Sequence, residues 1–126
     1  QRQMCIRDSP QAMYDDFVKI SEPIQKIRPD YPFEVKVREP RKRPTRMGGT
    51  DASVFAIEGV PTLGFTTEDF KGYDFDYGEI WHTERDLYTK NIPEYQEHTA
   101  TVTAIIALGV ANLDKQLSRE GLYTEE

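Results

Sequence analysis

Residues 48–86 place a glycine-led turn, a short helical segment and a strand in direct succession, and this succession limits the fold more than any other feature. The segment GGTDASVFAIEG predicts a helix over residues 52–58, with Gly59 in the position that commonly follows a helix. Residues 62–66, TLGFT, are rich in β-branched and aromatic side chains, as strands are. A helix that alternates with strands predicts a layered α/β fold.

The first half of the chain supplies further elements of this fold. Apolar residues spaced by three and four predict a helix over residues 10–27 that kinks or restarts at Pro23, whose nitrogen cannot donate a helical hydrogen bond. Residues 33–37, FEVKV, alternate between apolar and charged side chains and predict a strand with one buried face. Residues 1–9, QRQMCIRDS, resemble translated adapter sequence at the edge of an assembled reading frame, so we interpret them as a non-native segment outside the fold.

The last part of the chain predicts one long helix that begins at Pro93. A broad apolar face over residues 102–117 predicts that this helix packs on the sheet, and Gly121 is expected to end it. His98, in its first turns, is expected to be structural or exposed. Residues 121–126 are expected to form a tail, with the final TEE disordered.

Composition and charge narrow the functional class. The chain has 126 residues, 37% hydrophobic and 30% charged, which suits one globular domain at most. Its net charge of −6 argues against nucleic acid as the main partner. The basic cluster at residues 38–46, REPRKRPTR, is interpreted as an exposed loop rather than an anion-binding patch, because it contains two prolines and no aromatic residue. The longest apolar run, residues 102–110, is too short to cross a bilayer.

Cysteine chemistry is absent from the expected domain. The only cysteine, Cys5, lies in the segment that we interpret as non-native. Residues 10–126 therefore offer no disulfide, no thiolate metal ligand and no cysteine nucleophile.

Three motifs carry the chemistry: GGTDASVF, PTLGF and EIWHTERD, in this order. Their order resembles the C-terminal part of the M28 family of zinc-dependent exopeptidases, and the related glutaminyl cyclases show the same order. The resemblance implies that residues 10–120 are the C-terminal portion of a three-layer α/β/α zinc-peptidase domain with a mixed central sheet. It further implies peptide or N-acyl amino acid substrates, two zinc ions in the full-length enzyme, and a secreted or periplasmic location.

The same resemblance assigns roles to individual side chains. It makes His82 a zinc ligand and places Asp51 in the carboxylate network around the metals, while Thr83 and Asp86 support the histidine loop. The acidic, aromatic residues 68–79 are expected to wall the substrate pocket, with candidates Phe70, Tyr73, Phe75, Tyr77 and Trp81. A calcium loop is a weaker interpretation of these acidic residues, because the EF-hand glycine and glutamate are not at their required spacing.

Two departures from the family pattern set the expected limits of this chain. Ala52 stands where the family usually has a histidine after the aspartate. Residues 10–47 contain none of the family's other metal-binding motifs and no Glu-Glu pair with the general base. We therefore expect the C-terminal fragment of a longer enzyme. The alternatives are a glutaminyl-cyclase-like acyltransferase and a non-catalytic binding domain of the same fold.

Overall fold

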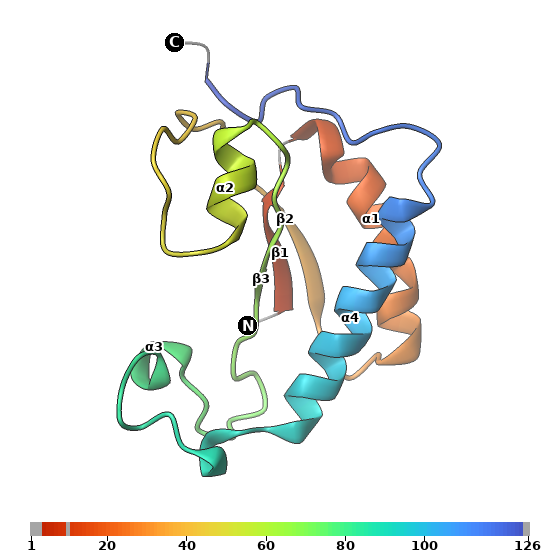
Figure 1. Cartoon of the computed structure of the whole chain (residues 1–126). Coiled ribbons are helices and arrows are strands. Elements are labelled where there is room, and N and C mark those ends of the chain that lie inside the picture. The colour runs from red at the N-terminus through yellow and green to blue at the C-terminus, as the bar shows by residue number, and fades with distance from the viewer. Residues whose placement is uncertain (1–3, 10, 125–126) are drawn as a thin grey trace.

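Three strands form a small mixed sheet in the structure, a computed structural model that describes residues 4–9 and 11–124 (Figure 1). Strand β1 (Met4–Ser9) lies between β2 (Phe33–Val37) and β3 (Gly64–Thr66). β1 runs parallel to β2 and antiparallel to β3. The predicted strand at residues 33–37 is present with the expected bounds, and the strand predicted at 62–66 is confined to its last three residues.

The exclusion of residues 1–9 from the fold is wrong for residues 4–9, which form the central strand. Ile6 pairs with Val35 on one side and with Phe65 on the other. Strand pairing uses backbone N–H and C=O groups, so a short segment without a clear side-chain pattern can occupy the position between two strands. The non-native origin of these residues stays a prediction.

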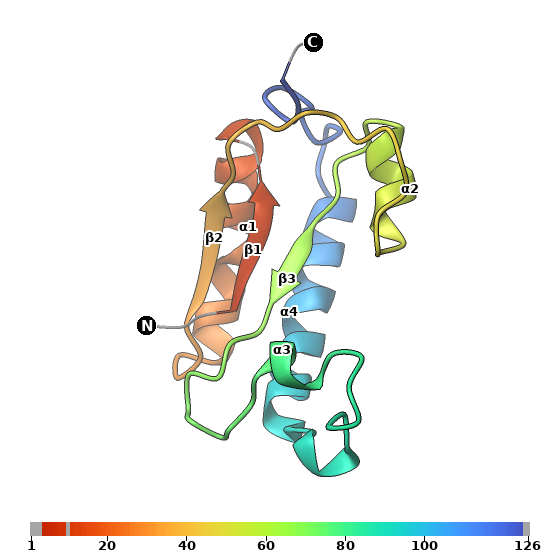
Figure 2. The ribbon, with the colours of Figure 1, turned by 90° about the vertical axis from the view of Figure 1, so that its left-hand side faces the viewer.

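Two long helices, α1 (Gln11–Ile27) and α4 (Pro93–Ala111), pack on each other and lie on one side of the sheet (Figures 1 and 2). Their close approach depends on Gly109, because a Cβ atom there would lie 2.3 Å from Cγ2 of Ile20. Of the two outcomes predicted at Pro23, the restart is wrong, since α1 continues through this residue as one helix, and the kink stays a prediction. Pro23 is exposed, so water can satisfy the carbonyl group that lacks its helical partner.

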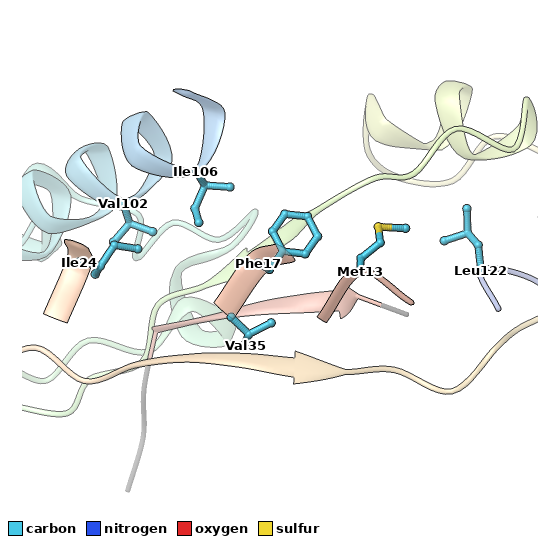
Figure 3. Packing of buried hydrophobic residues seen from close by; sticks show 7 residues of the cluster. All are labelled: Met13, Phe17, Ile24, Val35, Val102, Ile106 and Leu122. Carbon is cyan, nitrogen blue, oxygen red and sulfur yellow. The ribbon is translucent and has the colours of Figure 1, made fainter. Parts of the chain in front are cut away.

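The hydrophobic core lies between these helices and the sheet (Figure 3). Its buried members come from both helices, from β2 and from the C-terminal segment: Met13, Phe17, Ile24, Val35, Val102, Ile106 and Leu122. The helical members are spaced by four or seven residues, so each helix presents one apolar stripe to the core.

The shorter elements lie around β3. Helix α2 (Ala52–Ile57) precedes this strand, and α3 (Tyr77–Ile80) and the 3-10 helix η1 (Tyr88–Lys90) follow it. α2 and α3 consequently lie toward opposite ends of β3 (Figures 1 and 2). The helix predicted at residues 52–58 is therefore present, one residue shorter, and Gly59 adopts the expected positive φ of 70°. The three-layer α/β/α arrangement stays a prediction.

The C-terminal segment differs from expectation. α4 ends at Ala111 instead of near Gly121, because Asn112 and Asp114 favour turns over helix. The expected tail is held to the fold as far as Thr124, whose N–H donates to the carbonyl oxygen of Arg41 at 3.0 Å. The last two residues of the TEE sequence, 125 and 126, lie outside the described residues.

None of the helices within residues 11–124 combines the length and the apolar character needed to cross a membrane.

Candidate functional site

His82 lies two residues beyond the end of α3, on a loop that exposes its side chain. Its φ is +56°, in the left-handed region that residues with a side chain rarely adopt. The imidazole packs edge-on against the indole of Trp81, with 4.5 Å between the ring centroids. A non-glycine residue held at positive φ costs roughly 1–3 kcal/mol, and such positions concentrate at functional sites.

Thr83 closes the turn that carries His82. Its hydroxyl donates to the carbonyl oxygens of Glu79 at 2.8 Å and Ile80 at 3.1 Å. It also accepts from the backbone N–H of Arg85 at 3.2 Å. Asp86 joins the turn through its backbone, since its N–H donates to the carbonyl oxygen of Thr83 at 3.2 Å.

Asp51 is the N-cap residue of α2, the short helix beside β3 (Figure 2). Its side chain is exposed and makes no capping hydrogen bond. Among the side chains that the structure describes, no group of three or more His, Cys, Asp or Glu is placed to hold a metal ion. The residues that the structure describes therefore do not fit a zinc site by themselves.

The five predicted pocket aromatics separate into two groups. Phe70, Tyr73 and Phe75 surround Tyr95 of α4, at centroid distances of 5.6, 5.5 and 6.2 Å. Tyr77 and Trp81 stack on each other across α3, 6.5 Å apart, and both are more than half exposed. The first group attaches residues 68–86, called the acidic segment below, to α4. The second group lies on the surface.

A cavity of about 530 Å³ lies between the acidic segment and the first half of α4. Of the predicted site residues, only Phe75 and Asp86 line it. The other principal lining residues come from η1, α4 and the residues just before these helices, and were not predicted: Leu87, Tyr88, Ile92, Tyr95 and Thr99. The helical spacing of Tyr95 and Thr99 with the core residue Val102 is the sequence signal that could have identified the α4 side of this cavity.

Polar groups give the cavity some chemical character. Asp86, Lys90 and Asn91 line it. The Nζ atom of Lys90 pairs with Asp74 at 3.1 Å, and the side-chain oxygen of Asn91 is buried without a hydrogen-bond partner among the described residues. A cavity with apolar walls and a few polar groups can orient a small ligand.

An ionic cluster fastens the acidic segment to the rest of the fold. Lys71 pairs with Glu94 at the start of α4 and, at 3.4 Å, with Asp30 after α1. Arg28 contacts the same two carboxylates, at 3.2 Å for Asp30 and 3.3 Å for Glu94. The hydrogen bond from Lys71 is the main reason that the pKa of Glu94 falls to about 2.

Asp69 is a second fastening point. Its carboxylate accepts from the hydroxyl of Tyr95 at 2.6 Å and from the backbone N–H groups of Tyr73 at 2.8 Å and Phe75 at 3.2 Å. Burial alone would raise the pKa of Asp69, but these hydrogen bonds outweigh burial and lower it. Tyr95 also accepts from the N–H of Lys71 at 3.0 Å, and burial raises its pKa to about 12.

His98 is buried, and its Nε2 atom has no hydrogen-bond partner among the described residues. Its ring is 4% exposed and lies 4.4 Å from the ring of Tyr31, and burial lowers its pKa.

No family model, no curated protein and no solved structure matches this chain.

Proposed function

We propose that this chain is the C-terminal portion of a zinc-dependent exopeptidase of the M28 type, acting on peptides or N-acyl amino acid derivatives. The observation that carries the proposal is the exposed His82 at positive φ, beside Trp81 and on a turn fastened by Thr83. A ligand histidine must be accessible and must be fixed in orientation, and both properties support this role.

The placement of the three motifs adds support. GGTD leads into α2, PTLGF continues into β3, and WHT directly follows α3. Loops at the ends of strands are common carriers of binding and catalytic residues. Since the described residues offer no complete donor set, we expect the remaining zinc ligands and the general base to come from sequence outside these 126 residues.

The cavity beside α4 is the proposed site for a substrate side chain. Its volume of about 530 Å³ lies within the usual range for small-molecule pockets, roughly 300–1,000 Å³. Phe75, Leu87 and Tyr95 would supply apolar contacts, and Asn91 holds a buried oxygen without a partner in the described chain.

The deciding experiment is recovery and expression of the longer reading frame. We expect upstream sequence with the missing His-x-Asp and Glu-Glu motifs in place of residues 1–9. The protein should retain about two zinc ions and release amino acids from aminoacyl or acyl-amino acid substrates. Cyclisation of an N-terminal glutamine substrate would favour the glutaminyl-cyclase alternative, and a native gene that begins at Gln1 would refute the fragment proposal.

Substitutions in that longer protein separate the roles. His82→Ala should lose one zinc and reduce turnover by orders of magnitude, whereas Asp51→Ala should reduce turnover with less effect on metal content. His98→Gln is the matched control and should keep zinc content and turnover per folded molecule. Dispensable His82 with essential His98 would show that the motif assignment is wrong.

The 126-residue chain alone gives a complementary test. With added zinc it should show no peptidase activity and should lose the metal on dialysis, because a single histidine with exposed carboxylates gives weak affinity. It should also tend to associate, since α2 exposes the apolar side chains of Val54 and Phe55. Turnover above blank with two zinc ions retained would contradict this expectation.

A further inference from the structure

The basic loop, residues 38–46, borders a second cavity, of about 570 Å³, between this loop, α2 and β3. Arg41, Lys42 and Arg46 line the cavity together with Thr50 and Ser53. None of these three cations forms an ion pair within the described residues, although the chain as a whole carries a net charge of −6. Three unpaired cations around one hollow repel each other and favour an anion between them.

The basic loop is held at two points close to these cations. Arg41 forms a β-bridge with Tyr123, and its carbonyl oxygen accepts from the N–H of Thr124 at 3.0 Å. Two residues further on, Nε of Arg43 donates to the carbonyl oxygen of Ile57 at 2.6 Å. The loop is thus attached to the C-terminal segment and to α2 on either side of Lys42, which lowers the entropic cost of ordering it around a ligand.

Ser53 provides a second, independent observation. Its hydroxyl oxygen is buried and has no hydrogen-bond partner among the described residues, and the residue lines the same cavity. A buried hydroxyl without a partner is unfavourable in a folded protein and points to a missing ligand group or water. Thr50 adds a second hydroxyl close by in the sequence.

We propose that this cavity binds a small molecule through a phosphoryl group. Two guanidinium groups, one ammonium group and two hydroxyl groups offer more donors than the two oxygens of a carboxylate can accept. The three outer oxygens of a phosphate monoester match this donor set better, and arginine pairs with them in bidentate geometry. The site goes beyond the proposed peptidase function and does not depend on it.

The test is a titration of the ¹⁵N-labelled chain with inorganic phosphate and, separately, with O-phosphoserine, at constant ionic strength. Saturable shifts of the amide signals of Gly48, Thr50, Ser53 and Gly64 are expected with both compounds. Tighter binding of O-phosphoserine would indicate a phosphate monoester as the natural ligand, and equal binding would indicate free phosphate. Succinate, as the carboxylate arm, should bind about tenfold more weakly or not at all.

Variants locate the binding energy. Arg46→Gln should weaken phosphate binding about tenfold, because it removes one charge-assisted contact. Ser53→Ala should weaken binding about threefold while leaving the unliganded chain as stable as before, since the lost hydroxyl has no partner there. Lys26→Gln, on α1, is the charge-matched control and should bind phosphate normally.

Several results would overturn the proposal. Shifts that do not saturate, or equal weakening by Arg46→Gln and Lys26→Gln, would show only a general charge effect. Equal binding of succinate would remove the phosphoryl preference. Binding of an oligonucleotide without binding of either small phosphate compound would show an open electrostatic surface instead of a small-molecule site. The dispersion of the amide signals in each spectrum reports whether that variant is folded.

Discussion

Two segments of opposite charge flank α2 and β3 in the chain. The basic loop, residues 38–46, precedes α2, and the acidic segment, residues 68–86, follows β3. They differ in how far their charged side chains are paired with other residues. The acidic segment has seven carboxylates and two cations, a net charge of −5, and the basic loop has five cations and one carboxylate, a net charge of +4. Asp69, Lys71 and Asp74 are paired or hydrogen-bonded to residues outside the segment, and Glu79 pairs with Arg85 within it. Arg41, Lys42 and Arg46 have no ion pair within the described residues.

This difference separates charges that build structure from charges that are available to bind. The acidic segment has little regular structure, so side-chain contacts with α4 determine its conformation. The basic loop is fixed mainly through backbone atoms and through Arg43, which leaves the three neighbouring cations free for a ligand. The predictions below test this contrast.

The largest effect on the free energy of unfolding is expected from Tyr95→Phe, because Tyr95 holds the acidic segment against α4. The change removes the hydrogen bonds with Asp69 and with the N–H of Lys71, at a residue that is only 4% exposed. We expect a loss of about 1–3 kcal/mol in the free energy of unfolding, measured by urea denaturation. Tyr88→Phe, at a residue that is 91% exposed, is the control and should change stability by less than about 0.5 kcal/mol. Equal effects of the two changes would show that the acidic segment is not anchored through Tyr95.

Lowering the pH should also weaken the attachment of the acidic segment to α4, and this loss of stability should be gradual. The pKa of Glu94 is about 2 in the folded chain and near its ordinary value of 4.5 in the unfolded chain, so unfolding takes up a proton between these values. The stabilisation by Glu94 is therefore complete above about pH 4.5 and is lost as the pH falls toward 2. Asp69, whose folded pKa is also lowered, contributes in the same direction.

Glu94→Gln sharpens the acid prediction. This variant should start less stable at pH 6 and should lose less stability than the original chain between pH 5 and pH 2.5. Glu97→Gln, one turn further along α4 at an exposed position, is the matched control and should keep the original slope. Thermal unfolding midpoints over this pH range provide the measurement, and identical slopes for all three chains would contradict the role of Glu94.

The smallest effect on stability is expected from substitutions in the basic loop. Arg41→Gln combined with Arg46→Gln should leave the stability of the unliganded chain within about 0.5 kcal/mol or raise it slightly, because these cations have no carboxylate partner in the described chain. Lys71→Gln, which removes contacts with Asp30 and Glu94, should lower the unfolding midpoint clearly in the same assay. A greater loss in the double variant than in Lys71→Gln would reverse the contrast between the two regions.

Local pattern was sufficient to predict most of the regular elements. The alternation of residues 33–37 predicted β2 with its observed bounds, and the spacing of apolar residues predicted α1 and the start of α4 at Pro93. These patterns are reliable because a strand repeats every two residues and a helix every 3.6, so the local sequence shows which face is buried. It does not show which residues pack against that face, as Leu122 does in the same cluster as Met13.

Only the tertiary structure determined the features that depend on contacts between segments far apart in the sequence, whether through backbone pairing or through side chains. It made residues 4–9 the central strand, because the backbone of this segment pairs with β2 on one side and with β3 on the other. It also brought Tyr95 to Asp69, and the basic loop to Ser53, across separations that no local pattern encodes. The motif around His82 was evident in the sequence, whereas the positive φ of His82 follows only from the fold.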